Sequence, residues 1–195
     1  MIKVSLVENK IFWFIAIFSP IIFSILGHLS IFLCLIYLVI VQQKYKFVLK
    51  KKEFFNVFIY SILFVPIIIL LSIVSKLSLP EFTEQQQVKD LRDSFFEVIS
   101  RDGIMIVLLA PIIEEVVFRG LFYAALKSYF PWFVSIIFSS IIFALIHGNI
   151  LAFTLLFSLS LLLTFIYELY GKLFYPILIH SCFNISMLFL IYFGK

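Results

Sequence analysis

The sequence predicts an all-α protein, a polytopic bundle of about six or seven transmembrane helices. Hydrophobic residues make up 64% of the 195 residues, whereas a typical soluble domain contains roughly 45–50%. Charged residues make up only 13%, and the mean hydropathy is +1.18. A chain with so few polar residues cannot cover its apolar surface in water, so most of it must face lipid.

The distribution of charge favours a membrane protein over a nucleic-acid-binding protein. The net charge is +4, and five of the lysines crowd into residues 44–52. Such a cluster is typical of a cytoplasmic loop that orients a membrane protein. We therefore expect the lipid bilayer as a partner and no nucleic acid. Cys34 and Cys182 form no CxxC motif and indicate nothing about the redox compartment.

Residues 1–75 are expected to form the N-terminal transmembrane helices. Residues 11–41 contain no charge, and a single helix of this length would be about 46 Å long, beyond a hydrocarbon core of about 30 Å. The Gly27-His28 step favours a hairpin of two short helices, and one long helix kinked at Pro20 is the alternative. The hairpin gives about seven spans with the N-terminus inside, and the single helix gives about six with it outside.

A polar segment, residues 76–102, follows a charge-free span at residues 54–75. It holds six of the 11 acidic residues. Apolar residues recur in it at helical spacing, namely Val88, Leu91, Phe95 and Val98. We expect an amphipathic helix at the membrane surface, serving either as a solvated connection or as a gate for substrate.

Residues 103–195 are expected to form a four-helix core. Its predicted spans are residues 103–126, 131–147, 150–167 and 173–194. Charged residues and histidines inside these spans, together with the polar Asn184, lie on three of the helices, namely Glu114, Glu115, Arg119, His147, His180 and Asn184. A charged side chain at the bilayer centre costs about 2.5–3.5 kcal/mol on insertion scales, so these residues are functional candidates.

Helical spacing separates the two adjacent glutamates. Glu115 and Arg119 are i,i+4 neighbours and can pair, either as a structural clamp or as part of a site. Glu114 points about 100° away around the helix and has no partner on that helix. A carboxylate without a local partner is a candidate general base.

The histidines and the asparagine are residue types that can assist a general base in a hydrolysis reaction. His180 and Asn184 share a helix face, as do Phe143 and His147. An imidazole and an amide can stabilise an oxyanion, and a carboxylate with imidazoles can polarise a water, with or without zinc. Peptide-bond hydrolysis within the membrane is the expected reaction. Residue counting places Glu114 about 20 Å and His180 about 10 Å from the inner face, so either helix tilt or a span boundary misplaced by several residues would be needed to bring them together.

Three motifs, E-E-x-x-x-R, F-x-x-x-H and H-x-x-x-N, occur in this order on separate predicted helices. Over residues 103–194 they resemble the CPBP family, the CAAX-processing and bacteriocin-processing (Abi) intramembrane proteases. The resemblance implies an intramembrane endopeptidase in which Glu114, assisted by His147, activates a water. It also implies that His180 and Asn184 stabilise the oxyanion, and that Glu115 and Arg119 hold the site together.

The resemblance leaves the cofactor, the substrate and the biological role open. The motifs do not decide whether a zinc ion is bound, and His147 and His180 would be its ligands. The expected partner is a peptide or membrane-protein substrate, and peptide maturation and bacteriocin self-immunity are candidate roles. The richness in Phe, Ile and Lys suggests a low-GC bacterial source, and the expected location is therefore a bacterial plasma membrane. A non-catalytic immunity or regulatory protein and a proton-coupled transporter are the alternative functions.

Overall fold

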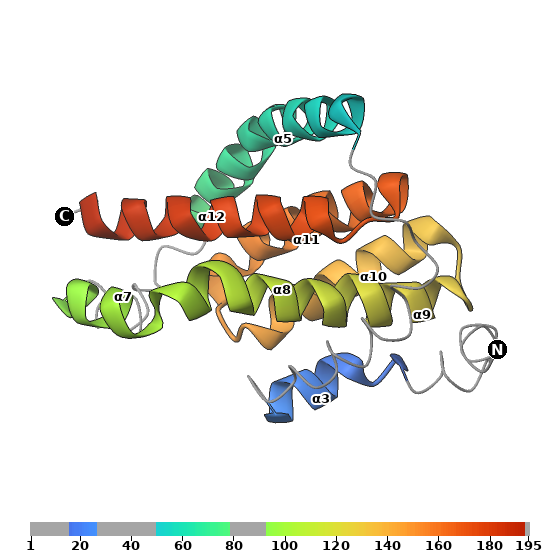
Figure 1. Cartoon of the computed structure of the whole chain (residues 1–195), viewed down its shortest axis with the longest axis horizontal. Coiled ribbons are helices and arrows are strands. Elements are labelled where there is room, and N and C mark those ends of the chain that lie inside the picture. Colours follow the sequence, from blue (N-terminus) through green and yellow to red (C-terminus); the bar gives the residue numbers. More distant parts are fainter. Residues whose placement is uncertain (1–15, 27–49, 79–92, 194–195) are drawn as a thin grey trace.

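The computed structural model describes residues 16–26, 50–78 and 93–193 (Figure 1). These parts are helical throughout apart from short turns, and no strand occurs within them, which confirms the predicted all-α bundle. The choice between an N-terminal hairpin and one long helix depends largely on residues 1–15 and 27–49, which lie outside the described residues.

Helices follow one another along the described parts of the chain with few breaks. In chain order they are α3 (Ser19–Leu26), α5 (Lys51–Ser78), α7 (Phe95–Ile104), η2 (Met105–Leu109), α8 (Ala110–Glu115), η3 (Val116–Tyr123), α9 (Ala124–Lys127), α10 (Trp132–Ile146), α11 (Ile150–Tyr170) and α12 (Phe174–Phe193). The segments α7 to α9 are continuous and are called the central rod below. Its segments η2 and η3 are π-helical, a local geometry that is frequent at functional sites.

Three helices of the described parts are long and apolar enough to cross a bilayer. They comprise Lys51–Leu71 within α5, Ala152–Tyr170 within α11, and Phe174–Phe193, which is α12. The fourth apolar helix, α10, has 15 residues. At 1.5 Å per residue α10 is about 22 Å long, which is shorter than a hydrocarbon core of about 30 Å.

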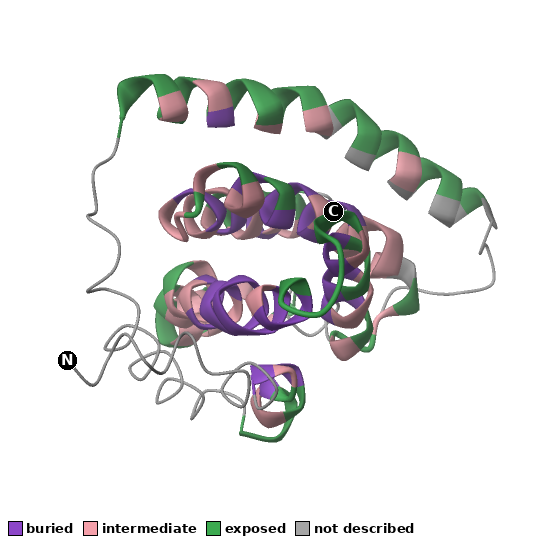
Figure 2. Ribbon diagram, turned by 90° about the vertical axis from the view of Figure 1, so that its right-hand side faces the viewer, coloured by how far each residue is buried: buried purple, intermediate pink, exposed green. Residues whose placement is uncertain are grey.

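The hydrophobic core lies where η3 packs against α10. Val117, Phe118 and Phe143 are completely buried, and the rings of Phe118 and Phe143 meet edge to face at 4.9 Å between centroids. In Figure 2 the buried residues gather on the helices inside the bundle, whereas α5, along the top, is exposed over most of its length. This packing holds the rod and α10 at a fixed spacing, and both helices carry predicted site residues.

Polar side chains tie the outer helices to this core. Glu53 at the start of α5 accepts hydrogen bonds from Lys172 and from the Tyr175 hydroxyl. Glu168 near the end of α11 accepts one from the Tyr123 hydroxyl at 2.7 Å and pairs with Lys127. These contacts join α5, the rod, α11 and the start of α12, and so limit how far the helices can slide past one another.

A tight reversal joins α10 to α11 and places His147 at the turn. Gly148 has a φ of 61°, in the left-handed region that side chains with a Cβ rarely adopt. Asn149 then caps α11 by accepting the Ala152 backbone N–H at 3.0 Å. Because the chain reverses here within a few residues, the orientation of His147 depends on this turn.

Candidate active site

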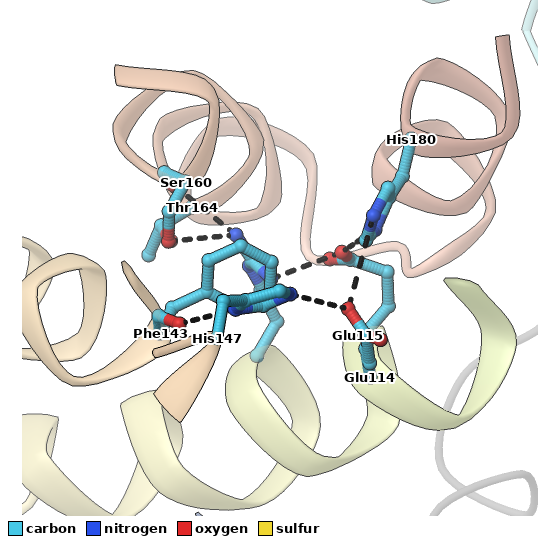
Figure 3. A network of polar contacts seen from close by, with 8 residues as sticks. Glu114, Glu115, Phe143, His147, Ser160, Thr164 and His180 are labelled. Atoms are coloured by element: carbon cyan, nitrogen blue, oxygen red, sulfur yellow. Dashed lines mark hydrogen bonds and ion pairs between the residues drawn. The ribbon is translucent and has the colours of Figure 1, made fainter. Parts of the chain in front are cut away.

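The predicted site residues Glu114, His147 and His180 come together from three helices (Figure 3). The Glu114 Oε2 atom lies 3.9 Å from His147 Nε2 and 3.8 Å from His180 Nε2. The side chain of His147 is 27% exposed, whereas those of Glu114 and His180 are 14% and 5% exposed. The site is therefore buried on the α12 side and more open toward the turn after α10.

The difference in depth that residue counting predicts between Glu114 and His180 is wrong, because their side chains meet at 3.8 Å. The counting assumed that all helices end in one plane. The rod instead continues from Glu114 to Lys127, whereas α12 begins at Phe174, much closer along its helix to His180. Helix tilt, or helix ends at different levels, changes the depth of a residue, so distance along a helix does not measure depth.

The hydrogen bond at His147 fixes which ring nitrogen carries the proton. Its Nδ1 atom lies 2.7 Å from the Phe143 carbonyl oxygen. A carbonyl can only accept, so Nδ1 carries the hydrogen and donates it. In the neutral ring the Nε2 atom then has a free lone pair, and this atom faces Glu114.

His180 is oriented in the same way through a different partner. Its Nδ1 atom lies 2.8 Å from Glu115 Oε1, and an ionised carboxylate accepts the hydrogen bond. His180 Nε2 therefore also faces Glu114 with a lone pair when the ring is neutral. The two adjacent glutamates thus contact opposite sides of the His180 ring. Glu115 accepts the Nδ1–H and orients the ring, and Glu114 faces the Nε2 atom.

Arg119 holds Glu115 in place. The i,i+4 pair is formed, with Arg119 Nη1 2.9 Å from Glu115 Oε1 and both side chains fully buried. Arg119 Nη2 donates to Ser160 Oγ at 2.9 Å, and the guanidinium lies over the Phe143 ring at 4.8 Å. Phe143, the first residue of the F-x-x-x-H motif, therefore supports both Arg119 and His147.

Asn184 contacts the backbone of η2, and this hydrogen bond is not to another predicted site residue. Its amide donates to the Ile106 carbonyl at 2.9 Å, which ties α12 to the π-helical η2. Among the described residues, no hydrogen bond links Asn184 to Glu114, His147 or His180. An amide has a second N–H, so this bond leaves one donor for another partner.

Ser160 and Thr164 are site neighbours that the sequence patterns did not reveal. Both lie on α11, the one core helix to which no candidate residue was assigned, and both are fully buried. The sequence feature that could have identified them is the i,i+4 spacing of the two hydroxyl residues, which places both on one face of an apolar span. Hydroxyls in membrane helices usually bond their own backbone, so this signal did not mark them as part of the site.

The charges of the site leave room for one shared proton. Glu114 and Glu115 carry two carboxylates, and Arg119 supplies one permanent positive charge. The Glu114 Oε2 atom is buried and has no hydrogen-bond partner among the described residues. One proton held by Glu114 or by an imidazole would bring the formal charge of the set to zero. The arrangement is therefore suited to accepting a proton and returning it.

His147 and His180 are the metal ligands expected from the sequence, and their Nε2 atoms both face Glu114 Oε2. Within the described ranges, no three His, Cys, Asp or Glu side chains are grouped so that they could hold a metal ion. A catalytic zinc ion normally has three protein ligands. A zinc ion held by His147 and His180 therefore stays a prediction, and none of the chemistry below depends on a metal.

The comparisons with known proteins agree with the motifs. A family model described as "Type II CAAX prenyl endopeptidase Rce1-like" matches residues 99–186, a segment that contains every predicted site residue. These residues are similar to the CAAX protease family, and together with the long apolar helices the match indicates an integral membrane protein. No curated protein and no solved structure matches the chain.

Proposed function

We propose that this protein is an intramembrane endopeptidase that uses Glu114 to hydrolyse a peptide bond of a peptide or membrane-protein substrate. One observation carries the proposal. A buried carboxylate oxygen of Glu114, without a hydrogen-bond partner among the described residues, faces the Nε2 atoms of His147 and His180 at 3.9 and 3.8 Å. A carboxylate held beside two imidazoles can act as a general base with groups that carry protons within its reach.

The reaction proceeds through attack of water on the scissile carbonyl carbon. Glu114 accepts a proton from the water, assisted by His147, while the water oxygen forms the new C–O bond and the carbonyl electrons move to oxygen. His180, protonated at Nε2, donates a hydrogen bond to the resulting oxyanion. Glu115 accepts the His180 Nδ1–H and balances its positive charge.

Breakdown of the intermediate returns the proton. Glu114 transfers it to the amide nitrogen, the C–N bond breaks, and an amine and a carboxylic acid leave the site. The second N–H of Asn184 is available to the oxyanion if the substrate approaches from the η2 side. Water must reach the site from one side of the membrane, and the partial exposure of His147 marks the more open side.

The substrate is proposed only as a class. A prenylated C-terminal tail, a bacteriocin leader and a signalling peptide would all present the same scissile amide to Glu114. The matched family is described as prenyl endopeptidases, and a role in peptide maturation or bacteriocin self-immunity at a bacterial plasma membrane is compatible with the same chemistry.

A comparison of cellular peptides tests this function directly. Cells carrying the wild-type protein or the Glu114→Gln variant, matched for the amount in the membrane, are compared by peptide mass spectrometry. Peptides that arise only with the wild-type protein support proteolysis and reveal the cleaved sequence. A biological effect that the Glu114→Gln variant retains in full would instead support a non-catalytic role.

Removal of metal ions tests the zinc alternative. We expect a chelator such as 1,10-phenanthroline to leave cleavage by the purified protein unchanged, because the proposed steps use only Glu114, the two histidines and water. The measurement is the initial rate before and after chelation, together with the metal content of the protein. Loss of cleavage that added zinc restores would contradict this expectation and assign His147 and His180 as ligands.

The turn after His147 gives a prediction about stability and activity together. We expect Gly148→Ala to destabilise the protein by about 1 kcal/mol, because its φ of 61° strains any residue with a Cβ. No atom lies within 4 Å of the added Cβ, so a steric clash does not contribute. Thermal unfolding in detergent measures the loss, and cleavage assays measure its effect on His147.

Gly171→Ala is the matched control for this substitution. Gly171 has a φ of 63° and also has open space around an added Cβ, but it lies at the other end of α11. Both variants should lose similar stability, and only Gly148→Ala should also slow cleavage. Equal rates in the two variants would show that the turn does not position His147.

A further inference from the structure

We propose that Ser160 on α11 is a positioning residue: its hydroxyl fixes Arg119, and through Arg119 and Glu115 it sets the orientation of His180. The inference rests on the proposed function insofar as it concerns catalysis. It is carried by an unbroken series of buried contacts from α11 to the site, part of which Figure 3 shows.

The first contact in this series links Ser160 to Arg119. Arg119 Nη2 lies 2.9 Å from Ser160 Oγ and 3.3 Å from the Ser160 carbonyl oxygen. The carbonyl oxygen also accepts the Thr164 hydroxyl at 2.7 Å. The hydroxyl of Ser160 therefore forms the shorter of the two hydrogen bonds from Nη2, and unlike the carbonyl oxygen it does not also accept the Thr164 hydroxyl.

The burial of Arg119 makes this contact important for its orientation. The guanidinium is fully buried, and its Nε atom has no hydrogen-bond partner in the described part of the chain. The orientation of the guanidinium therefore depends on two groups of hydrogen bonds, one from Nη1 to Glu115 and one from Nη2 to Ser160. Without the Ser160 hydroxyl, Nη2 keeps only the longer hydrogen bond to the Ser160 carbonyl oxygen, so the guanidinium is held less firmly.

Glu115 transmits such a rotation to His180 because a single oxygen serves both partners. Glu115 Oε1 lies 2.9 Å from Arg119 Nη1 and 2.8 Å from His180 Nδ1. A shift of this oxygen turns the imidazole and moves its Nε2 atom relative to Glu114. Misplacing a reacting group by about 1 Å can cost about 100-fold in rate, and loss of a supporting contact typically costs about 10- to 100-fold in metal sites.

The kinetic test uses Ser160→Ala with two companion variants. We expect Ser160→Ala to lower kcat about 10-fold or more with little change in KM, and Ser160→Thr, which keeps a hydroxyl, to restore part of the rate. The control is Ser158→Ala, because Ser158 lies on the same helix, is equally buried and, among the described residues, bonds its own helix backbone at the Thr154 carbonyl. Equal kcat values for Ser160→Ala, Ser158→Ala and the wild-type protein would overturn the proposal.

A spectroscopic test separates this inference from the proposed function. The chain contains only three histidines, so ¹⁵N-labelled imidazoles can be resolved by NMR and assigned with histidine variants. Ser160→Ala should shift the His180 Nδ1 signal, whereas the His147 signal and the Ser158→Ala spectrum should stay unchanged. An unchanged His180 signal would overturn the role of Ser160. A wild-type protein without Glu114-dependent cleavage would overturn the proposed function alone.

Discussion

Glu114→Gln is expected to reduce peptide cleavage by about 10²–10⁴-fold, the range that a positioned general base contributes. Glutamine has nearly the same shape as glutamate but cannot accept the proton of the attacking water. The fold should survive, because the Glu114 Oε2 atom has no hydrogen-bond partner to lose within the described residues. Initial rates on a peptide identified by the cellular comparison measure the loss, and thermal unfolding in detergent verifies the fold.

Glu97→Gln provides the matched control for this substitution. Glu97 lies on α7 near the start of the matched family segment and away from the site, so the same chemical change there should leave the cleavage rate unaltered. His147→Ala should also lose most activity, because its Nε2 atom lies next to Glu114. Cleavage at the wild-type rate by the Glu114→Gln variant would remove the mechanism proposed here.

Contacts within one helix were predictable from the sequence, and contacts between helices were less so. The i,i+4 spacing predicts that Arg119 and Glu115 pair, and the structure forms that pair. The contact between His180 and Glu115 joins residues 65 positions apart. No local periodicity encodes it, and the resemblance only implied that Glu115 holds the site together.

The roles of Asn184 and Ser160 depend on packing between helices in the same way. Spacing places Asn184 beside His180 on one face, but the π-helical turn of η2 brings the Ile106 carbonyl within its reach. A π-helical turn shifts the register of a helix and was not expected from these residues. Ser160 reaches the site because α11 packs against the rod, and that packing depends on the whole bundle.

Arg119→Met is expected to destabilise the protein by about 3–5 kcal/mol, which is typical of breaking a buried ion pair by removing one partner. Glu115 would remain as a fully buried carboxylate with His180 as its only described partner. The Ser160 hydroxyl would also lose the donor at 2.9 Å. Reversible unfolding of the detergent-solubilised protein measures the change in free energy.

Two variants separate a lost ion pair from a general loss of charge. Arg101→Met removes an exposed arginine that pairs with Asp102 on the surface, and its stability should stay close to that of the wild-type protein. The double variant Glu115→Gln/Arg119→Met should recover part of the stability that Arg119→Met loses, because no buried charge is then left unpaired. It should not recover activity, because a neutral glutamine in place of Glu115 cannot balance the charge of a protonated His180. Additive losses of stability in the double variant would show that the two residues do not act as a pair.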